Sequence, residues 1–187
     1  MINSFDSTLY QLINRKWTSE NLDFLMFNFS DKVFWIPFYV IVIFMMTKIF
    51  KKKTPLVLVF IGLALLGADR LTSGVMKPLF GRVRPCHEVS LSPRIIEGVH
   101  CSDTGSMASS HAANHFAIAV FMILLYGVSK RSNMVFWLLW ASAVAYSRVY
   151  LGVHYPTDVI VGGLVGAACG FISYKLYVLT SKKIYKE

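Results

Sequence analysis

The sequence predicts an all-α integral membrane protein, in which about five transmembrane helices form a bundle preceded by N-terminal amphipathic helices. Hydrophobic residues make up 55% of the 187 residues and charged residues only 16%. A soluble domain of this size cannot bury so much apolar surface. Apolar runs of roughly twenty residues, long enough to cross a bilayer, recur along the chain between short cationic clusters. We expect a single domain over residues 1–187.

Residues 1–32 are predicted to form short amphipathic helices at the membrane interface, ahead of the bundle at 33–187. Apolar side chains recur there at helical spacing in two stretches. They are Ile2, Phe5, Leu9, Leu12 and Ile13 in the first stretch and Leu22, Leu25, Met26 and Phe29 in the second. Such helices lie on the membrane surface or cover the helix bundle, and the two roles are compatible.

Five apolar segments define the expected membrane spans. They run over about 33–50, 55–76, 108–128, 134–150 and 156–179. With five spans, the cations at 51–53, at 130–131 and at the C-terminus fall on one side, which the positive-inside rule places in the cytoplasm. The loops at 77–107 and 150–156 then face outward, as does the N-terminus. We therefore expect a multi-pass protein of a bacterial inner membrane, with an external site and a cytoplasmic C-terminus.

The outward-facing loops nevertheless carry cations, against the positive-inside rule. They are Lys77, Arg82, Arg84, Arg94 and Arg148. An anionic ligand explains cations on this side better than topology does. The net charge of +9 does not indicate nucleic acid, because no basic helix face and no interleaving of aromatic and basic residues support that interpretation.

Cys86 and Cys101 flank the first outer loop, whereas Cys169 lies inside the last span. On an oxidising exterior, the first two could form a disulfide that closes the loop and joins its polar ends. Free thiols are the alternative, because spacing alone does not establish a bond. His87 and His100 stand beside these cysteines, so a metal site is a third and less favoured interpretation.

Gly162, Gly166 and Gly170 place small residues on one face of the last span. Small residues let two helix backbones approach each other closely. We expect this face to pack against another helix, either within the bundle or between subunits. The sequence leaves the oligomeric state open.

Three polar clusters are expected to meet at the outer end of the bundle, because short inner loops bring the outer ends of the spans together. The clusters run over Lys77–Pro85, Ala108–His111 and Ser147–Asp158. Arginine and lysine pair with phosphate oxygens, and the free N–H groups at a helix start favour anions. One histidine can attack phosphorus while another protonates the leaving oxygen. Together these residue types indicate phosphate chemistry.

The third cluster contains a candidate nucleophile. His154 and Asp158 are four residues apart, and Pro156 suits the first turn of a helix that begins just after the histidine. The carboxylate is then able to reach the imidazole and fix its tautomer, as an attacking histidine requires. The alternative is a capped helix start beside an arginine, Arg148, that extends to the membrane interface.

The three clusters resemble the signature of the type 2 phosphatidic acid phosphatase superfamily, the membrane lipid phosphate phosphatases. That signature reads lysine, six residues, Arg-Pro; then Pro-Ser-Gly-His; then Ser-Arg, five residues, His, three residues, Asp. The first part is matched by Lys77, Arg84 and Pro85, and the third in full by Ser147, Arg148, His154 and Asp158. The second part departs at two positions, where Ala108 and Ser110 replace the proline and the glycine.

The resemblance implies a role for each matching residue. His154 would be the nucleophile that forms a phosphohistidine, Asp158 would orient it, and His111 would protonate the leaving group and then activate water. The phosphate would be held by Lys77, Arg84, Ser109, Ser110 and Arg148. The side chain of Ser110 would either crowd the phosphate or add a hydroxyl to it. The family requires no metal, so the resemblance implies neither a metal nor another cofactor.

Two further polar residues fall outside the signature. Arg82 could reach a second phosphate or a headgroup, but we interpret it as a solvated loop cation. His115 lies one helical turn after His111 and is interpreted as a packing residue.

The predicted activity is metal-independent hydrolysis of a lipid phosphate or pyrophosphate within the bilayer. An outward-facing site on a short bacterial-type chain favours undecaprenyl diphosphate, as in an undecaprenyl-diphosphate phosphatase. Phosphatidylglycerophosphate, phosphatidic acid and lipid A phosphates are alternatives within the same chemistry. The resemblance extends to vanadate-dependent haloperoxidases, which use a similar anion pocket for oxidation. Those enzymes are soluble, so five membrane spans argue against a haloperoxidase activity. The third class of function is a protein that binds a lipid phosphate without hydrolysing it. Binding alone would not require a histidine nucleophile with its orienting carboxylate, so these residues argue against that class.

Overall fold

The computed structural model describes residues 4–185, and within this range it contains helices, turns and loops but no strand. The helices are α1 (Ser4–Gln11), α2 (Glu20–Ser30), α3 (Ile36–Phe50), α4 (Thr54–Asp69), α5 (Lys77–Phe80), α6 (Ser110–Tyr126), α7 (Arg131–Tyr150) and α8 (Pro156–Tyr185). Two π-helical segments continue α1 and join α4 to α5, at Leu12–Lys16 and Arg70–Met76. Short 3-10 turns lie at Lys51–Lys53, Pro85–His87 and Val89–Leu91. The predicted all-α class is confirmed.

Local sequence signals explain several helix boundaries. Pro37, Pro55 and Pro156 lie in the first turns of α3, α4 and α8, where an N–H has no partner within the helix. Ser109 is the N-cap of α6, and its hydroxyl accepts a hydrogen bond from the N–H three residues further on. Gly81 ends α5 with a φ of +52°, a left-handed conformation that glycine adopts without strain.

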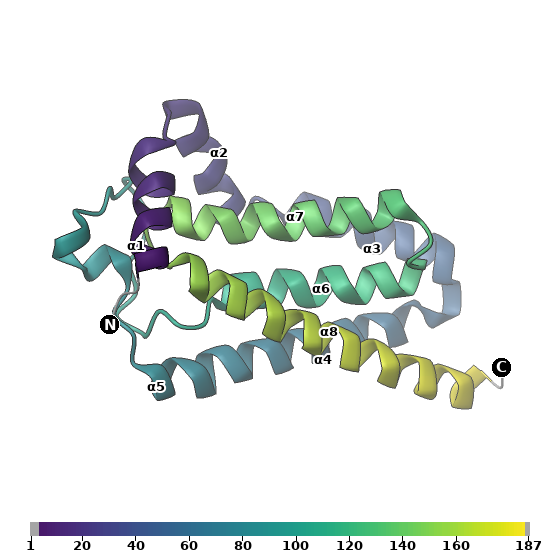
Figure 1. Cartoon of the computed structure of the whole chain (residues 1–187). Coiled ribbons are helices and arrows are strands. Elements are labelled where there is room, and N and C mark those ends of the chain that lie inside the picture. The colour runs from purple at the N-terminus through teal and green to yellow at the C-terminus, as the bar shows by residue number, and fades with distance from the viewer. Residues whose placement is uncertain (1–3, 186–187) are drawn as a thin grey trace.

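The long helices form one bundle in which α6 occupies the middle (Figure 1). It packs against α4, α7 and α8. The buried core among these helices and α3 includes Met46, Phe60, Phe121, Trp137 and Tyr177. The loop before α6 and the turn between α7 and α8 lie at one end of the bundle, whereas the end of α8 lies at the other (Figure 1).

Three glycines of α8 allow its backbone to touch the backbone of α6. A Cβ atom built at Gly162, Gly166 or Gly170 would lie 2.4, 2.0 or 2.3 Å from a carbonyl oxygen of that helix or its cap. Any side chain there would force the two helices apart. The predicted close packing is confirmed, and it occurs within the bundle.

α1 lies across the end of the bundle where α7 ends and α8 begins (Figure 1). The side chains buried by α1 and the π-helical segment after it are Asp6, Tyr10, Ile13 and Asn14. The predicted apolar stripe is therefore only partly the docking face, because Ile13 is buried but Phe5 is 50% exposed. Ile2, which was also assigned to that stripe, lies outside the described residues.

Two helical stretches of residues 4–185 are long and apolar enough to cross a membrane. The first stretch is 36–87, which contains α3 and α4, and the second is α8. The helix α6 is also apolar, but it is shorter. Large apolar side chains cover the outward surface of α3 and α4, among them Ile41, Phe44, Val59 and Leu66. Extensive apolar surface of this kind is typical of contact with a membrane. The number of five spans remains a prediction.

Two segments that carry cations in the sequence, the turn between α3 and α4 and the end of α8, lie at the end of the bundle opposite α1 (Figure 1). The Tyr185 hydroxyl near the end of α8 donates to the Lys52 carbonyl at 2.9 Å, next to the turn between α3 and α4. The ammonium groups of Lys52 and Lys53 lie 5.6 and 5.5 Å from the centre of the same tyrosine ring. The turn between α6 and α7, with Lys130 and Arg131, is at this end too (Figure 1).

Candidate active site

The three sequence motifs meet at the end of the bundle covered by α1, around a polar cavity of about 700 Å³. The predicted site residues that line it are Lys77, Arg84, Ser110, His111, Arg148 and His154. Asp158 and Ser109, the other two, are fully buried next to it. Residues from three separate parts of the chain therefore form a single site.

Asp158 holds His154 from the first turn of α8. Its Oδ2 lies 3.5 Å from the His154 Nδ1, and the two side chains are 0% and 2% exposed. The same oxygen accepts the Tyr155 N–H at 2.8 Å and a hydrogen bond from the Ser106 hydroxyl. The Ser106 Oγ also lies 3.5 Å from Nδ1. The carboxylate is thus fixed by several donors and directed at one nitrogen of the imidazole.

The loop that carries His154 is shaped by the end of α7. Gly152 has a φ of +78°, which a residue with a Cβ atom rarely adopts. The N–H groups of Val153 and His154 both donate to the Arg148 carbonyl at 3.2 Å. This turn places the side chains of the arginine and the histidine in the same cavity. The five residues between Arg148 and His154 in the third motif therefore form the turn that brings these two side chains together.

The other ring nitrogen of His154 faces a cation. Its Nε2 lies 3.4 Å from Nη1 of Arg84, whose guanidinium also donates to the carbonyls of Val153 and Thr104 at 3.1 and 2.9 Å. Burial and the positive charges of Arg84 and Arg148 lower the pKa of His154 to about 4, against the opposing effect of the nearby carboxylate. A neutral ring that donates Nδ1–H to Asp158 presents the Nε2 lone pair to the cavity.

Two more cations complete this wall of the cavity. Arg148 donates from Nη1 to the Ser30 hydroxyl at the end of α2. Lys77 follows the π-helical segment, and a Cβ at Gly105 would lie 2.8 Å from its carbonyl oxygen. The glycine thus allows the loop before α6 to close against α5. Three cations around one buried histidine form a site suited to a phosphate group.

The second motif is held by hydrogen bonds to its neighbours. Ser110, which stands where the resembling signature has glycine, has its hydroxyl 2.9 Å from Thr72 Oγ1 and 2.8 Å from Ser73 Oγ. The hydroxyl that was expected to crowd or bind the phosphate is thus engaged with the π-helical segment, although Ser110 still lines the cavity. Ser109 caps α6 and donates its N–H to the Asp158 carbonyl at 3.0 Å.

His111 and His115 occupy different surroundings although they are one turn apart on α6. His111 lines the polar cavity together with His154. The His115 ring lies against Trp140, with ring centres 4.8 Å apart, and its Nδ1 is 2.8 Å from the His111 carbonyl oxygen. The second histidine therefore has the contacts of a packing residue.

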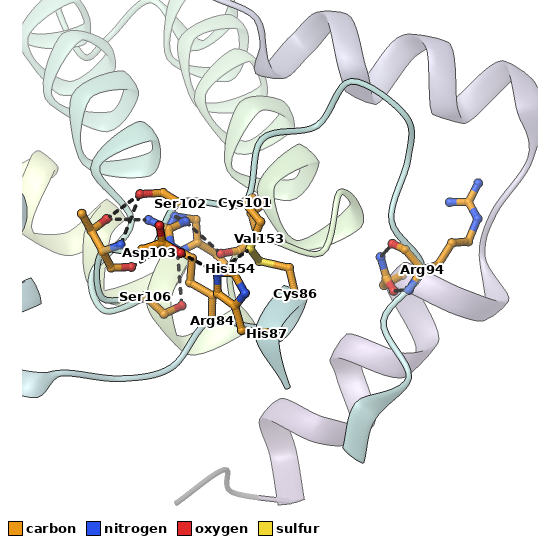
Figure 2. Close-up of a disulfide and its surroundings, with 12 residues drawn as sticks. Arg84, Cys86, His87, Arg94, Cys101, Ser102, Asp103, Ser106, Val153 and His154 are labelled. Atoms are coloured by element: carbon orange, nitrogen blue, oxygen red, sulfur yellow. Dashed lines mark hydrogen bonds and ion pairs between the residues drawn. A yellow bond between two sulfur atoms is a disulfide. The ribbon is translucent and has the colours of Figure 1, made fainter. Parts of the chain in front are cut away.

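A disulfide joins Cys86 and Cys101 next to Arg84 and His154, as Figure 2 shows. It links the segment after α5 to the segment that supplies Thr104 and Ser106, with a Cα–Cα distance of 6.3 Å. His87 Nε2 lies 3.2 Å from a sulfur of this bond. The less favoured metal site is not formed here, because both sulfurs are bonded to each other and His100 lines the polar cavity instead.

An apolar cavity of about 430 Å³ adjoins the polar one. The two share Ser30, Asp31, Lys32, Ser110 and His111. The rest of the apolar lining comes mostly from α3, α4 and α6 and includes Trp35, Phe38, Tyr39, Ile61, Leu65, Ile118 and Trp137. A molecule with a polar head and an apolar chain can therefore occupy both cavities at once.

Sequence reasoning missed several polar residues of this site. Arg82 is not the solvated cation that was expected, because its side chain is 17% exposed and pairs with Asp158 at 2.8 Å and with Asp6 at 2.6 Å. The position of Arg82 between Lys77 and Arg84, inside the first motif, was the one sequence signal that it belongs to the site. Ser106 and Ser30 contact the site as described above, but nothing in the sequence marks these serines.

Comparison with known proteins finds several similar ones. A family model described as the PAP2 superfamily matches residues 54–181. A lipid A 4'-phosphatase of Bacteroides thetaiotaomicron is 35% identical over 81% of this chain and 68% of its own length. An undecaprenyl-diphosphatase of Sulfolobus acidocaldarius is 30% identical over 92% of this chain and 78% of its own length. The crystal structure of LpxE from Aquifex aeolicus matches with a TM-score of 0.71 at 27% identity, covering 92% of this chain and 96% of that one.

Proposed function

Because the chain belongs to the PAP2 superfamily of lipid phosphatases, we propose that it hydrolyses a lipid-linked phosphate through a covalent phosphohistidine at His154. One observation carries this proposal: the Nδ1 of His154 faces Asp158 while its Nε2 faces Arg84 and the polar cavity. A histidine held in this way is oriented for attack on a phosphorus atom bound among cations.

The reaction has two steps. In the first, Nε2 of His154 attacks phosphorus, the bond from phosphorus to the lipid oxygen breaks, and His111 gives its proton to that oxygen. In the second, His111 removes a proton from water, the water oxygen attacks phosphorus, and the bond to His154 breaks to release phosphate. Lys77, Arg84 and Arg148 stabilise negative charge on the phosphoryl oxygens in both steps. Asp158 holds the Nδ1–H and stabilises the cationic ring.

The apolar cavity supports a lipid rather than a water-soluble substrate. It adjoins the polar cavity at His111, and its lining is mainly aliphatic and aromatic. Burying a lipid chain there keeps its apolar surface out of water while the phosphate lies near His154. A lipid would then enter sideways from the bilayer, between α3, α4 and α6.

We favour a glycolipid phosphate of the lipid A class as the substrate. The similarity to a lipid A 4'-phosphatase supports this choice. So does the polar cavity, because Ser102, Thr104 and His100 also line it and supply polar groups that can hydrogen-bond to sugar hydroxyls. Undecaprenyl diphosphate is the second candidate, favoured by Lys32, a further cation between the two cavities that suits a second phosphate.

The test of the reaction is phosphate release by the purified full-length protein in detergent, with a chelator present. Lipid A, undecaprenyl diphosphate and phosphatidylglycerophosphate are compared at equal concentrations. His154→Ala is expected to lower kcat by about 10³-fold or more, as loss of a nucleophile does. His87→Ala, a matched change at an exposed histidine outside the cavity, should leave it unchanged. Equal losses in both variants, or no release from any lipid, would refute the proposal.

Lys32→Ala separates the two substrate candidates. If Lys32 binds a second phosphate, its loss should raise KM for undecaprenyl diphosphate by about tenfold, roughly the 1.4 kcal/mol of one charge-assisted contact. The KM for a lipid with a single phosphate should stay within twofold. Equal changes for both lipids would show that Lys32 does not discriminate between them.

We place the site on the outer face of a bacterial inner membrane, with the C-terminus in the cytoplasm. The clustering of cations at the opposite end of the bundle supports this orientation. Val89 is 87% exposed in the loop before α6 and is suited to a labelling test. The Val89→Cys variant should react with a membrane-impermeant maleimide in intact cells. Labelling only after permeabilisation would reverse the orientation.

A further inference from the structure

α1 buries an acidic side chain against the bundle, where an interfacial helix usually buries an apolar one. Asp6 is 0% exposed, whereas its neighbour Phe5 is 50% exposed. Burying a carboxylate is costly unless it is paired and hydrogen-bonded. The position of Asp6 therefore points to specific partners rather than to simple covering of the bundle.

One partner is the first turn of α8. Asp6 Oδ1 accepts the Thr157 N–H at 2.9 Å, and Oδ2 accepts the Thr157 hydroxyl at 2.6 Å. The first N–H groups of a helix have no acceptor within that helix, and negative charge is favourable at this end. Asp6 thus caps α8 from a different helix. The residue that follows in α8 is Asp158.

The second partner is Arg82, which lies between two carboxylates. Its Nη2 donates to Asp6 Oδ2 at 2.6 Å, and its Nη1 donates to Asp158 Oδ1 at 2.8 Å. The Tyr155 ring lies against the guanidinium, with 3.9 Å from Cζ to the ring centre. Because a guanidinium is planar with donors in a rigid fork, these contacts fix its orientation. Asp158 is consequently held by Arg82 at Oδ1 and directed at His154 with Oδ2.

We infer that Asp6 is a positioning residue for the reaction, which acts through Arg82 on the carboxylate that orients His154. The inference rests on the proposed function. Asp6 lines a separate cavity, together with Arg82, and not the polar cavity that holds the phosphate-binding cations. It also lies outside residues 54–181, which the family model matches. Its effect should therefore fall on kcat rather than on KM.

Two purely structural roles for Asp6 predict a different outcome. As a cap of α8 it would act through the Thr157 N–H, a contact that does not involve Arg82, although the Thr157 hydroxyl also accepts from Arg82 Nη1 at 2.8 Å. As an anchor for α1 it would resemble Asn14, which is also 0% exposed and donates to the carbonyls of Tyr150 and Arg94 at 2.8 and 3.0 Å. Asn14→Ala is thus a matched control for loss of docking.

The test is a double-mutant cycle of Asp6→Asn and Arg82→Gln in the full-length protein in detergent, with lipid A as the substrate. Asp6→Asn should lower kcat by about tenfold, similar to the loss of partners that orient a metal ligand, with KM within threefold. Arg82→Gln should lower kcat further, and the double variant should be no slower than Arg82→Gln alone. Asn14→Ala should lower Tm but leave kcat within twofold.

Several outcomes would overturn the inference. Losses that multiply in the double variant would show that Asp6 acts on α8 without Arg82. An unchanged kcat in Asp6→Asn, or an equal loss in Asn14→Ala, would show that it only anchors α1. If Asp6→Asn does not fold, Arg82→Lys provides a second variant, because it keeps the charge but not the fork. It should lose kcat at constant KM, and full activity would contradict the inference.

A second measurement separates this inference from the proposed function. Carbethoxylation of His154 by diethyl pyrocarbonate, followed by peptide mass spectrometry, reports on the imidazole without turnover. It should slow in Asp6→Asn and Arg82→Gln without further slowing in the double variant, while modification of His111 stays constant. If this pattern occurs in a protein that releases no phosphate, the proposed function fails and the positioning role stands. If turnover is normal and neither measurement responds to Asp6→Asn, the positioning role alone fails.

Discussion

The contact between α6 and α8 makes a quantitative prediction about Gly166. In Gly166→Ala, the new Cβ would lie 2.0 Å from the Ala113 carbonyl oxygen, 2.7 Å from its carbon and 2.8 Å from its Cα. All three atoms belong to the α6 backbone, so no side chain can rotate away to make room. The two helices must separate locally by more than about 1 Å to restore ordinary van der Waals contact.

This separation has a cost that thermal unfolding can measure. Overpacking of a close contact typically costs about 1–3 kcal/mol. For a chain of this size, that corresponds to a decrease in Tm of about 2–12 °C. Tm would be measured by circular dichroism in one detergent at one scan rate, because unfolding of such a protein is sensitive to both.

Gly62→Ala is the matched control for this experiment. Gly62 lies inside α4, and a Cβ there meets nothing within 4 Å. Replacing a helical glycine with alanine at an unhindered position is stabilising by about 0.5–1 kcal/mol. The two variants should therefore move Tm in opposite directions. Similar shifts in both, or an unchanged Tm in Gly166→Ala, would refute the packing argument.

Three further predictions concern the site. The lowered pKa of His154 keeps its ring neutral as the pH falls, so the acidic limb of kcat/KM should lie near pH 4. A limb near pH 6.5 for two substrates with different phosphate pKa values would contradict this. Replacing Cys86 and Cys101 together with serine opens a loop with a sequence separation of 15, which should cost about 3 kcal/mol. Cys169→Ser is the control, and an equal loss of Tm would contradict a contribution from the disulfide. Ser110→Gly should keep kcat within about threefold, because its hydroxyl is bonded to the π-helical segment rather than committed to a ligand. A larger loss would assign that hydroxyl to the phosphate.

Several helices could be predicted closely because their limits are local. Pro156 begins α8 and Tyr150 ends α7, as the motif spacing and the apolar runs indicated. The pairing of His154 with Asp158 follows from the same local geometry, since a helix that begins after the histidine turns the carboxylate back toward the ring. Such features need no knowledge of how distant segments pack.

Other features depend on packing between segments far apart in the chain. Asp6 and Arg82 are 76 residues apart, and no periodicity marks them as partners. Hydrophobic spacing predicted an apolar docking face, but α1 buries Asp6 and the π-helical segment after it buries Asn14, and both side chains are hydrogen-bonded. The orientation of the Ser110 hydroxyl likewise depends on α4 and its π-helical extension, which lie beside the start of α6.

The sequence by itself determined the all-α class, the family motifs and the histidine–carboxylate pair, because composition, apolar run length and short-range spacing encode them. Only the tertiary structure decided which face of α1 docks, that Arg82 joins two carboxylates, and that an apolar cavity adjoins the polar one at His111. The physical reason is that a buried charge is stable only where its partners converge. That convergence is set by how the helices pack and not by spacing along the chain.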